Sequence, residues 1–581
     1  MIGGWLNTRK TWSHETRPME DEKQREAHNM TRPNIFSDNF SGILWFILPL
    51  YLIVLWIFNY GDTFGERDSY RVLVGIVDAI THGKPFLGGL MYGQDASPGY
   101  YAVLQYIIPR FGIDIHNLAR ALNNIALICS ILCLVPLYII AKSFGGRSTA
   151  LSAIVLIYTV PVWWSVSEYA HPIWPALLFF LLALALTALR PAFSGLGKYF
   201  CDGTVTLALA ISFSMRMDAV LMAPMMLAFC LDRGRVSFVA VLRLVLCGLA
   251  ALAVVGILKA VNPNPLLDTS AGSVWSLFVE YHNFSRFVLN FKNAQFSFAR
   301  AVNPFLLTSF VASVIYMICK RDLRALLLIV PTVAINYLFW IPNDNTRHFL
   351  YLVPALVFGV ARVTGDLMDG ALSSHKITKL CAISGLVFVG ISSVLHPIFD
   401  GKTIFFEHAP LALLLITATC QVLSERFSRL LRVGGAGMIV FAASITLVSV
   451  AQPSRLTMKT LYPLGMGAHY TGLGKSLLAL PPLGKTVLVI ADAYPIIAAM
   501  QMNASPPIAV ALVQNWTMLY VKSEHNDFKF FIQGWRQQDA VEAAIGLSAD
   551  TQIALLTDPA VAPDVAAILS DKPNIQLLSR P

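Results

Sequence analysis

The chain has few charged residues for its length. Only 13% of its 581 residues are Asp, Glu, Lys or Arg, 56% are hydrophobic, and the mean hydropathy is +0.61. In soluble globular proteins about a quarter of the residues are charged, so this composition excludes a soluble globular protein. Apolar runs recur with short polar breaks, and a helix needs about 20 apolar residues to cross a bilayer. We therefore predict an α-helical polytopic membrane protein rather than a β-barrel.

The predicted outer loops contain no cysteine, which excludes disulfide bonds there. All eight cysteines fall in or beside apolar segments, at positions 129, 133, 201, 230, 247, 319, 381 and 420. The histidines show no H-x₃-H spacing, so we predict no zinc site from them. No glycine-rich phosphate loop precedes a helix near Asp492, which argues against a nucleotide site.

We predict no cleavable signal peptide. Residues 1–40 are expected to form a cytoplasmic tail. About thirteen spans follow, at 41–58, 118–141, 149–166, 172–189, 203–215, 219–231, 237–258, 302–319, 325–341, 349–363, 377–395, 409–423 and 434–450. With the N-terminus inside, the inner segments hold sixteen Lys and Arg against six Asp and Glu, and the outer segments twelve against thirteen. This asymmetry follows the positive-inside rule, and it explains the net charge of +9 without a nucleic-acid partner.

We divide the chain into the tail (1–40), a transmembrane module (41–450) and an extracytoplasmic α/β domain (451–581). Within the module, 59–117 and 259–301 are the large outer loops, and we expect 68–82 and 98–111 to be interfacial amphipathic helices. The spans 203–215 and 219–231 are short, which suggests half-depth helices meeting at Arg216-Met217-Asp218. In the last part, strands are expected at Thr486–Asp492, Ala509–Val513, Met518–Val521 and Ile553–Thr557, with a helix at Pro495–Met502 and a further segment at Asp539–Gly546.

The first outer loop carries the strongest chemical signal. Acidic residues at 62, 66 and 68 stand beside Arg67, Tyr70 and Arg71, just outside the first span. Each acid alone is more often a solvated loop charge. Together they offer a carboxylate that can accept a proton and cations that can receive an anionic leaving group.

These motifs resemble the GT-C superfamily of polyprenol-phosphate-sugar glycosyltransferases, which includes protein O-mannosyltransferases and the lipid A aminoarabinose transferase. The resemblance rests on an acid-rich segment with Asp68-x-x-Arg71 spacing after the first span, the paired aromatics of Ser97-Pro98-Gly99-Tyr100-Tyr101, and Arg120 entering the second span. It extends to Arg216-Met-Asp218 and to the stretch from Arg347 to Pro354. The family usually has a Lys and a double Pro where this chain reads Asp95-Ala96-Ser97-Pro98.

The resemblance implies an inverting glycosyltransferase on the outer face of a bacterial inner membrane. Its donor would be a polyprenyl-phosphate-linked sugar and its acceptor a glycan, lipid or protein. Asp68 is the favoured base and Glu66 the alternative. The donor phosphate is assigned to Arg71, Lys84, Arg347 and Arg216, and substrate contacts to Tyr70, Tyr100, Tyr101, Glu168, His171, His348 and Asp218.

For several residues the sequence leaves two roles open. Arg216 and Asp218 form either an internal ion pair or a contact with the donor. Arg347 is either a snorkelling anchor or a ligand of the lipid phosphate. Glu168 and His171 belong either to a solvated loop or to a sugar contact. No cofactor is assigned; the acids at 62, 66 and 68 are the place where a divalent metal would bind, although a metal is not favoured. A secondary transporter or lipid flippase, or an inactive scaffold of the same fold, is the rival function.

Overall fold

The computed structural model describes separate parts of the chain. These are Leu73, Ile76 and Val77, then 98–113, 117–157, 160, 162–163, 171–232, 234–261, 304–340, 346–368, 475–479, 487–490, 500, 509–512, 518–522, 527–531, 545, 553–557 and 562–579. The predicted spans at 41–58, 377–395, 409–423 and 434–450 lie outside these ranges, as do the tail 1–40 and the loop 259–301 apart from residues 259–261.

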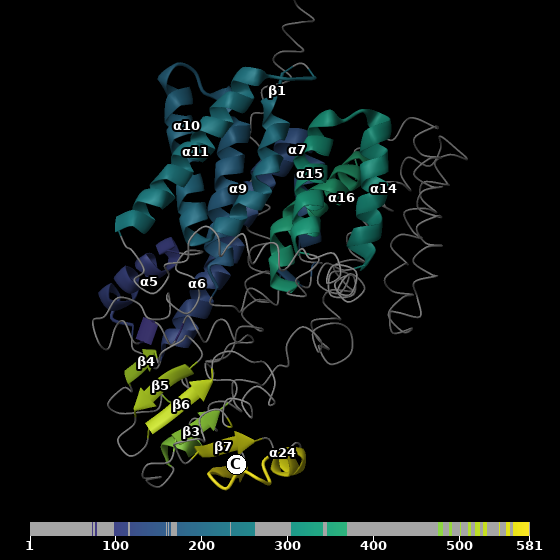
Figure 1. Cartoon of the computed structure of the whole chain (residues 1–581). Coiled ribbons are helices and arrows are strands. Elements are labelled where there is room, and N and C mark those ends of the chain that lie inside the picture. The colour runs from purple at the N-terminus through teal and green to yellow at the C-terminus, as the bar shows by residue number, and fades with distance from the viewer. Residues whose placement is uncertain are drawn as a thin grey trace, which may run out of the picture.

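The described part of residues 117–368 is a bundle of apolar helices (Figure 1). They are α6 (Leu118–Leu132), α7 (Leu134–Ile157), α9 (Ile173–Leu189), α10 (Leu196–Met215), the 3₁₀ helix η4 (Met217–Cys230), α11 (Phe238–Val261), α14 (Pro304–Lys320), α15 (Leu323–Trp340), η5 (Thr346–Leu352) and α16 (Val353–Met368). Four stretches within the described residues are long and apolar enough to cross a membrane: Leu118–Ile154, Ile173–Ala192, Phe238–Leu258 and Phe349–Asp366. The chain is therefore a helical membrane protein, as its composition predicts.

The first of these stretches is too long for one crossing. It has 37 residues, whereas about 20 suffice for a span. Its helix is interrupted at Gly146, whose φ of 81° and ψ of −169° are not helical. Such a backbone conformation is accessible to glycine because it has no Cβ. The interruption falls in the loop predicted between the spans 118–141 and 149–166.

The expectation of a half-depth helix at 203–215 is wrong, although α10 and η4 do meet at Arg216 as predicted. Helix α10 begins at Leu196 and has 20 residues, enough for a full span. It continues through the polar residue Asp202 because Arg190, directly after α9, neutralises that carboxylate. Helix η4 has 14 residues, but a 3₁₀ helix rises about 2.0 Å per residue, so it extends over about 28 Å.

A buried asparagine compensates for the proline inside η4. In a 3₁₀ helix the carbonyl of Leu221 would accept the N–H of residue 224, and Pro224 has none. Asn336 of α15 replaces that donor: its Nδ2 donates to the Leu221 carbonyl at 3.0 Å. Asn336 is fully buried. Asn336 therefore supplies the donor that Pro224 lacks, and the same bond holds η4 against α15.

Helices α7 and α16 pack closely at small residues. A Cβ at Gly365 would lie 2.3 Å from Thr149 Oγ1, so only glycine permits this approach. Further along the pair, Phe144 and Phe358 meet edge to face with ring centroids 5.7 Å apart. This contact is part of the apolar core that joins the bundle.

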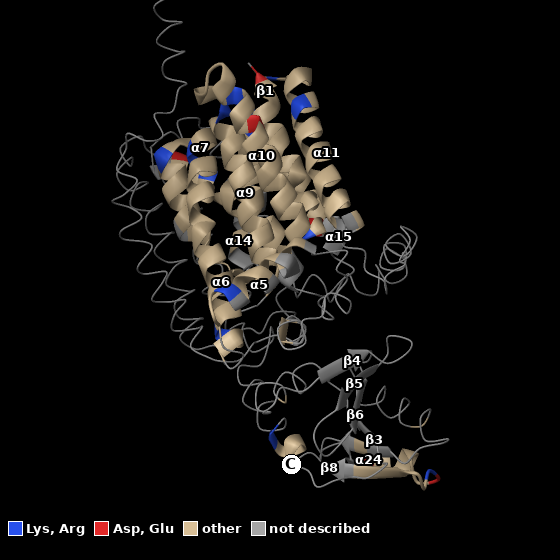
Figure 2. Cartoon of the chain, turned by 90° about the vertical axis from the view of Figure 1, so that its left-hand side faces the viewer, with Lys and Arg blue, Asp and Glu red and all other residues tan. Residues whose placement is uncertain are grey.

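The two ends of the bundle differ in charge. We call the end that carries the short β1–β2 hairpin (Leu231–Asp232 and Arg235–Val236) the hairpin end, and the end near α5 (Pro98–Arg110) the α5 end (Figures 1 and 2). Described basic residues gather toward the hairpin end: Lys142, Arg147, Arg190, Lys198, Arg235, Arg243, Lys320, Arg321, Arg324 and Arg362. The described acids there are Asp202, Asp232, Asp322 and Asp366. Under the positive-inside rule, the hairpin end is expected on the cytoplasmic side.

At the hairpin end, ion pairs join helices that are distant in sequence. Asp366 of α16 accepts hydrogen bonds from Tyr316 at 2.8 Å and from Lys320 at 2.7 Å, both on α14. Arg362 bonds to Asp366 at 2.8 Å and to Asp322 at 3.0 Å. These contacts tie α14, α15 and α16 together where they reach the membrane surface.

Helix α5 forms in the segment 98–111, where a helix is expected. Tyr100, Leu104 and Ile108, spaced four residues apart, are buried, whereas Tyr106 and Phe111 are exposed. An exposed aromatic face on a short helix is typical of a membrane interface.

A six-stranded sheet forms from the last part of the chain. Its strands are β3 (Val487–Ile490), β4 (Ala509–Leu512), β5 (Met518–Lys522), β6 (Asp527–Phe531), β7 (Ile553–Thr557) and β8 (Ile575–Ser579), in the order β4-β5-β6-β3-β7-β8. Strand β3 is parallel to β6 and β7, and β7 to β8, whereas β4, β5 and β6 are antiparallel. Strands β6 and β8 were not predicted. The sheet lies beyond the α5 end of the bundle (Figures 1 and 2).

Candidate functional site

Four polar side chains meet at the α5 end of the bundle. They are His171, two residues before α9; Arg216, between α10 and η4; Asp218, in the first turn of η4; and Tyr351, in η5. We call this group the Arg216 network. It joins elements separated by up to 180 residues in sequence, so folding rather than local spacing brings it together.

The backbone at Arg216 is what separates α10 from η4. Arg216 is extended, with φ of −160° and ψ of 119°, and its N–H caps α10 by donating to Ser212 at 2.9 Å. Its carbonyl then accepts the N–H of Ala219 at 3.2 Å. The break leaves Asp218 in the first turn of η4, where the helix dipole favours a negative charge.

Arg216 and Asp218 form a close ion pair. The Nε of Arg216 lies 2.8 Å from Oδ1 and 2.6 Å from Oδ2 of Asp218. Their side chains keep 12% and 15% of their accessible surface, so the pair is largely withdrawn from water. The ion pair, one of the two roles left open by the sequence, is present in the structure.

His171 adds a second contact to the guanidinium. The Nη1 of Arg216 lies 2.8 Å from Nε2 and 3.2 Å from Nδ1 of the ring, and the N–H of Ile173 is 3.3 Å from Nδ1. In a neutral imidazole one nitrogen accepts and the other donates, so which of these contacts is a hydrogen bond depends on the tautomer of the ring. His171 is buried.

Tyr351 completes the network from the far side. Its hydroxyl donates to Oδ1 of Asp218 at 2.9 Å, and its side chain is fully buried. A buried tyrosine hydroxyl needs such a partner. The bond fixes η5 against η4, which also places the backbone of Arg347 and His348 within one turn or so of the network.

The charges of Arg216 and Asp218 cancel within the network. Asp218 already accepts hydrogen bonds from Arg216 and Tyr351, so it is a poor candidate for taking a proton from a substrate. The guanidinium presents N–H donors at this end of the bundle.

Helix α5 connects the first outer loop to this network. A Cβ added at Gly99 would lie 2.3 Å from Oγ and 3.1 Å from the backbone carbon of Ser214. Ser214 is two residues before Arg216. Gly99 of the Ser97-Pro98-Gly99-Tyr100-Tyr101 motif is therefore packed onto the end of α10, next to the network, and only a residue without a side chain fits there.

Six of the predicted site residues lie outside the described part of the chain: Glu66, Asp68, Tyr70, Arg71, Lys84 and Glu168. Tyr101 belongs to α5, and Arg347 and His348 to η5, by their backbone positions. Tyr100 is buried on the inward face of α5. The structure thus brings together three of the predicted residues, His171, Arg216 and Asp218.

The sequence interpretation missed Tyr351 and the role of Gly99. Tyr351 stands within the apolar stretch from Arg347 to Pro354, and a tyrosine in such a run signals a buried hydroxyl with a partner. The partner, Asp218, is 133 residues away, so spacing alone does not identify it. Among the described residues, no group of three or more His, Cys, Asp or Glu side chains is arranged to hold a metal ion.

No protein-family model and no curated protein matches the chain. Among solved structures it is similar to ArnT from Cupriavidus metallidurans in the apo state, at 12% identity and a TM-score of 0.39, over 80% of this chain and 85% of that one. A structure of the same protein bound to undecaprenyl phosphate matches at the same identity and TM-score.

The chain is also similar to the archaeal oligosaccharyltransferase AglB from Archaeoglobus fulgidus, in complex with an inhibitory peptide and a dolichol-phosphate. Identity is 13% and the TM-score 0.41, over 78% of this chain and 63% of that one. The chain thus spans less than two thirds of the archaeal enzyme.

Proposed function

We propose that the protein is a membrane-embedded, inverting glycosyltransferase that uses a polyprenyl-phosphate-linked sugar on the outer face of a bacterial inner membrane. The acceptor is a hydroxyl group of an envelope glycan, lipid or protein. The observation that carries the proposal is the packing of Gly99 on Ser214 beside the Arg216 network. Gly99 belongs to the same predicted outer loop as the acidic motif, so we expect the acids to lie at the same end of the bundle as the network.

The reaction follows from the residue chemistry. Asp68, or Glu66 in its place, takes the proton of the acceptor hydroxyl, and the oxygen attacks the anomeric carbon. The bond between that carbon and the phosphate oxygen breaks on the opposite face, so the configuration inverts. Polyprenyl phosphate leaves with an additional negative charge and needs no general acid.

Cations at the outer surface stabilise this developing charge more than the ground state. The candidates are Arg71, Lys84, Arg347 and Arg216. Because Arg216 is paired with Asp218, its part is to orient N–H donors, and the net positive charge falls to the other three. Tyr70, Tyr101 and His348 remain candidates for contact with the sugar or acceptor.

A transporter or flippase would carry ionisable groups near the middle of its spans. In the described bundle, the ion pairs of the Arg216 network and of the hairpin end lie at helix ends. This distribution favours surface chemistry over passage through the bundle.

The test is a deletion strain complemented with Asp68→Asn or with wild type. We expect the variant to reach the membrane in normal amounts and to leave the envelope acceptor without its sugar, since a general base is worth about 10² to 10⁴ in rate. Glu66→Gln is the matched control that separates the two candidate bases. Normal transfer by both variants would refute the assignment of the loop as catalytic.

A further inference from the structure

We propose that the hairpin end binds a phospholipid of the cytoplasmic leaflet, with its anionic headgroup at Arg243 and an acyl chain in a groove between α10, η4 and α11. This site is separate from the proposed sugar transfer and does not depend on it. It rests on three observations: the groove, a surplus of positive charge, and an exposed aromatic surface.

The groove is apolar and lies between three helices. It has a volume of about 250 Å³ and is lined by residues such as Leu209 and Phe213 of α10, Met226 and Cys230 of η4, and Leu244 and Gly248 of α11. All of its lining side chains are apolar. An apolar groove on a membrane-spanning bundle suits a hydrocarbon chain.

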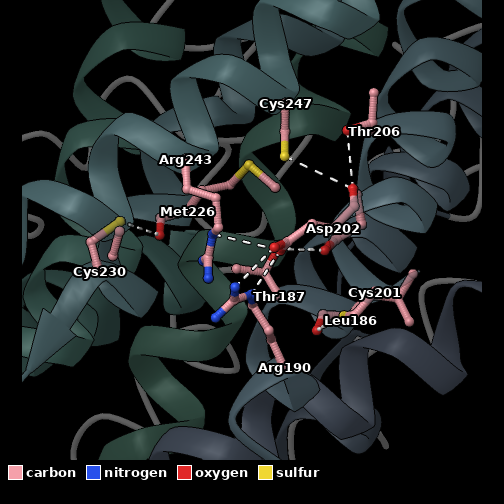
Figure 3. A network of polar contacts seen from close by, with 12 residues as sticks. Leu186, Thr187, Arg190, Cys201, Asp202, Thr206, Met226, Cys230, Arg243 and Cys247 are labelled. Atoms are coloured by element: carbon pink, nitrogen blue, oxygen red, sulfur yellow. Dashed lines mark hydrogen bonds and ion pairs between the residues drawn. The ribbon is translucent and has the colours of Figure 1, made fainter. Parts of the chain in front are cut away.

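Two guanidinium groups share one carboxylate at the hairpin end (Figure 3). Arg190 binds Asp202 in a bidentate manner, with Nε and Nη2 at 2.7 and 2.9 Å from the two oxygens. Arg243 approaches the same carboxylate only to 3.6 Å, which is too long for a hydrogen bond. Its Nε is buried and has no hydrogen-bond partner among the described residues. One positive charge therefore remains uncompensated within the triad.

The triad and the groove are continuous along the same helices. Asp202 lies seven residues, or two turns, before Leu209, so the two share one face of α10. Arg243 directly precedes Leu244 on α11. Figure 3 shows Met226 and Cys230, which line the groove, beside Arg243. A lipid whose chain fills the groove would thus bring its phosphate to the guanidinium.

The surroundings match the surface of the cytoplasmic leaflet. Phe193, Tyr199, Phe200 and Phe238 are exposed at this end, beside the basic residues Lys198 and Arg235. Exposed aromatic rings gather at the level of lipid headgroups. Basic sites between spanning helices on the cytoplasmic side attract anionic headgroups, which makes an anionic phospholipid the expected occupant.

The test measures the lipids that stay bound to the purified full-length protein. The wild type, extracted in mild detergent, is analysed by native mass spectrometry and by extraction of its lipids. We expect about one tightly bound anionic phospholipid per chain. Arg243→Gln should lower its retention about tenfold, because a hydrogen bond to a charged group is lost.

A second variant tests the groove without touching the charge. A Cβ at Gly248 would meet no atom within 4 Å, so Gly248→Leu should fill the groove without a clash and displace the chain. Gly256→Leu is the matched control, because Gly256 is on the same helix with equally open space and does not line the groove. Arg110→Gln is the control for charge, since Arg110 is exposed at the opposite, α5 end of the bundle. Both controls should retain the lipid.

Three results would overturn the proposal. The first is a wild type that holds no phospholipid. The second is equal retention in Arg243→Gln, Gly248→Leu and the controls. The third is a polyprenyl lipid in place of the phospholipid, which would make the groove part of the donor site.

Discussion

At the scale of single residues, the Arg216 network depends on the shape of the guanidinium. Arg216 donates from Nε to Asp218 and from Nη1 to His171, in two directions at once. A lysine ammonium is a point charge on a flexible chain and cannot reproduce this fork. The charge at position 216 and its geometry can therefore be tested separately.

We predict that Arg216→Lys lowers sugar transfer about a hundredfold, since misplacement of catalytic elements by about 1 Å has effects of that size. Arg190→Lys is a matched control, because Arg190 forms a similar pair with Asp202 at the opposite end of α10. The control should lower thermal stability without changing transfer per folded molecule. Equal loss of transfer in both variants would mean that the Arg216 network is only structural.

The sequence identified residues of the Arg216 network but did not predict their contacts with one another. His171, Arg216 and Asp218 were candidates because charged and imidazole groups are rare beside apolar runs. Their mutual contacts depend on how α9, α10 and η4 pack, which no local pattern encodes. The ion pair between Arg216 and Asp218 could be established only from the distance between their side chains.

At the scale of elements, Gly99 lets α5 pack directly against the end of α10. We predict that Gly99→Ala displaces α5, because the new Cβ would lie 2.8 Å from the Cβ and 3.1 Å from the backbone carbon of Ser214. Transfer should fall at least about tenfold. Gly203→Ala, on α10 with no atom within 4 Å of the added Cβ, is the control.

A double variant sharpens this prediction. Ser214→Gly removes the side-chain atoms nearest to the new Cβ, so Gly99→Ala with Ser214→Gly should recover part of the transfer. Full activity in Gly99→Ala alone would show that the contact does not position the loop.

Helix η4 gives a prediction about stability. We expect Asn336→Leu to destabilise the protein by about 1–3 kcal/mol, because the carbonyl of Leu221 would lose its donor opposite Pro224. Thr332→Val, one turn earlier on α15, is the control. The hydroxyl of Thr332 is buried without a hydrogen-bond partner among the described residues, so its loss should cost little. Thermal unfolding in detergent measures both, and equal effects would contradict the compensation.

Helices were predictable where the length of an apolar run alone determines where they begin and end. Apolar run length located α9, α11, α14, α15 and α16 to within a few residues at most ends. It failed for α10 because the helix passes through Asp202, and the partners that permit this, Arg190 and Arg243, are 12 and 41 residues away in sequence. Strands β6 and β8 were missed because their pairing, rather than their composition, makes them strands.

At the scale of the whole molecule, the charge asymmetry of the bundle and the position of the sheet agree with one orientation. The basic hairpin end is expected inside, and the α5 end, the acidic loop and the sheet outside, where a lipid-linked sugar rather than a nucleotide sugar is the available donor. In the absence of the protein, the pool of the lipid-linked sugar is therefore expected to change.

The most direct measurement of the central claim is the lipid pool of a deletion strain. We predict that a polyprenyl-phosphate-linked sugar accumulates in extracted lipids and that the same sugar disappears from an envelope acceptor, because the donor is no longer consumed. Restoring the wild-type gene should reverse both changes. An unchanged pool with an unchanged envelope would contradict the proposed transfer and favour a transporter or an inactive scaffold.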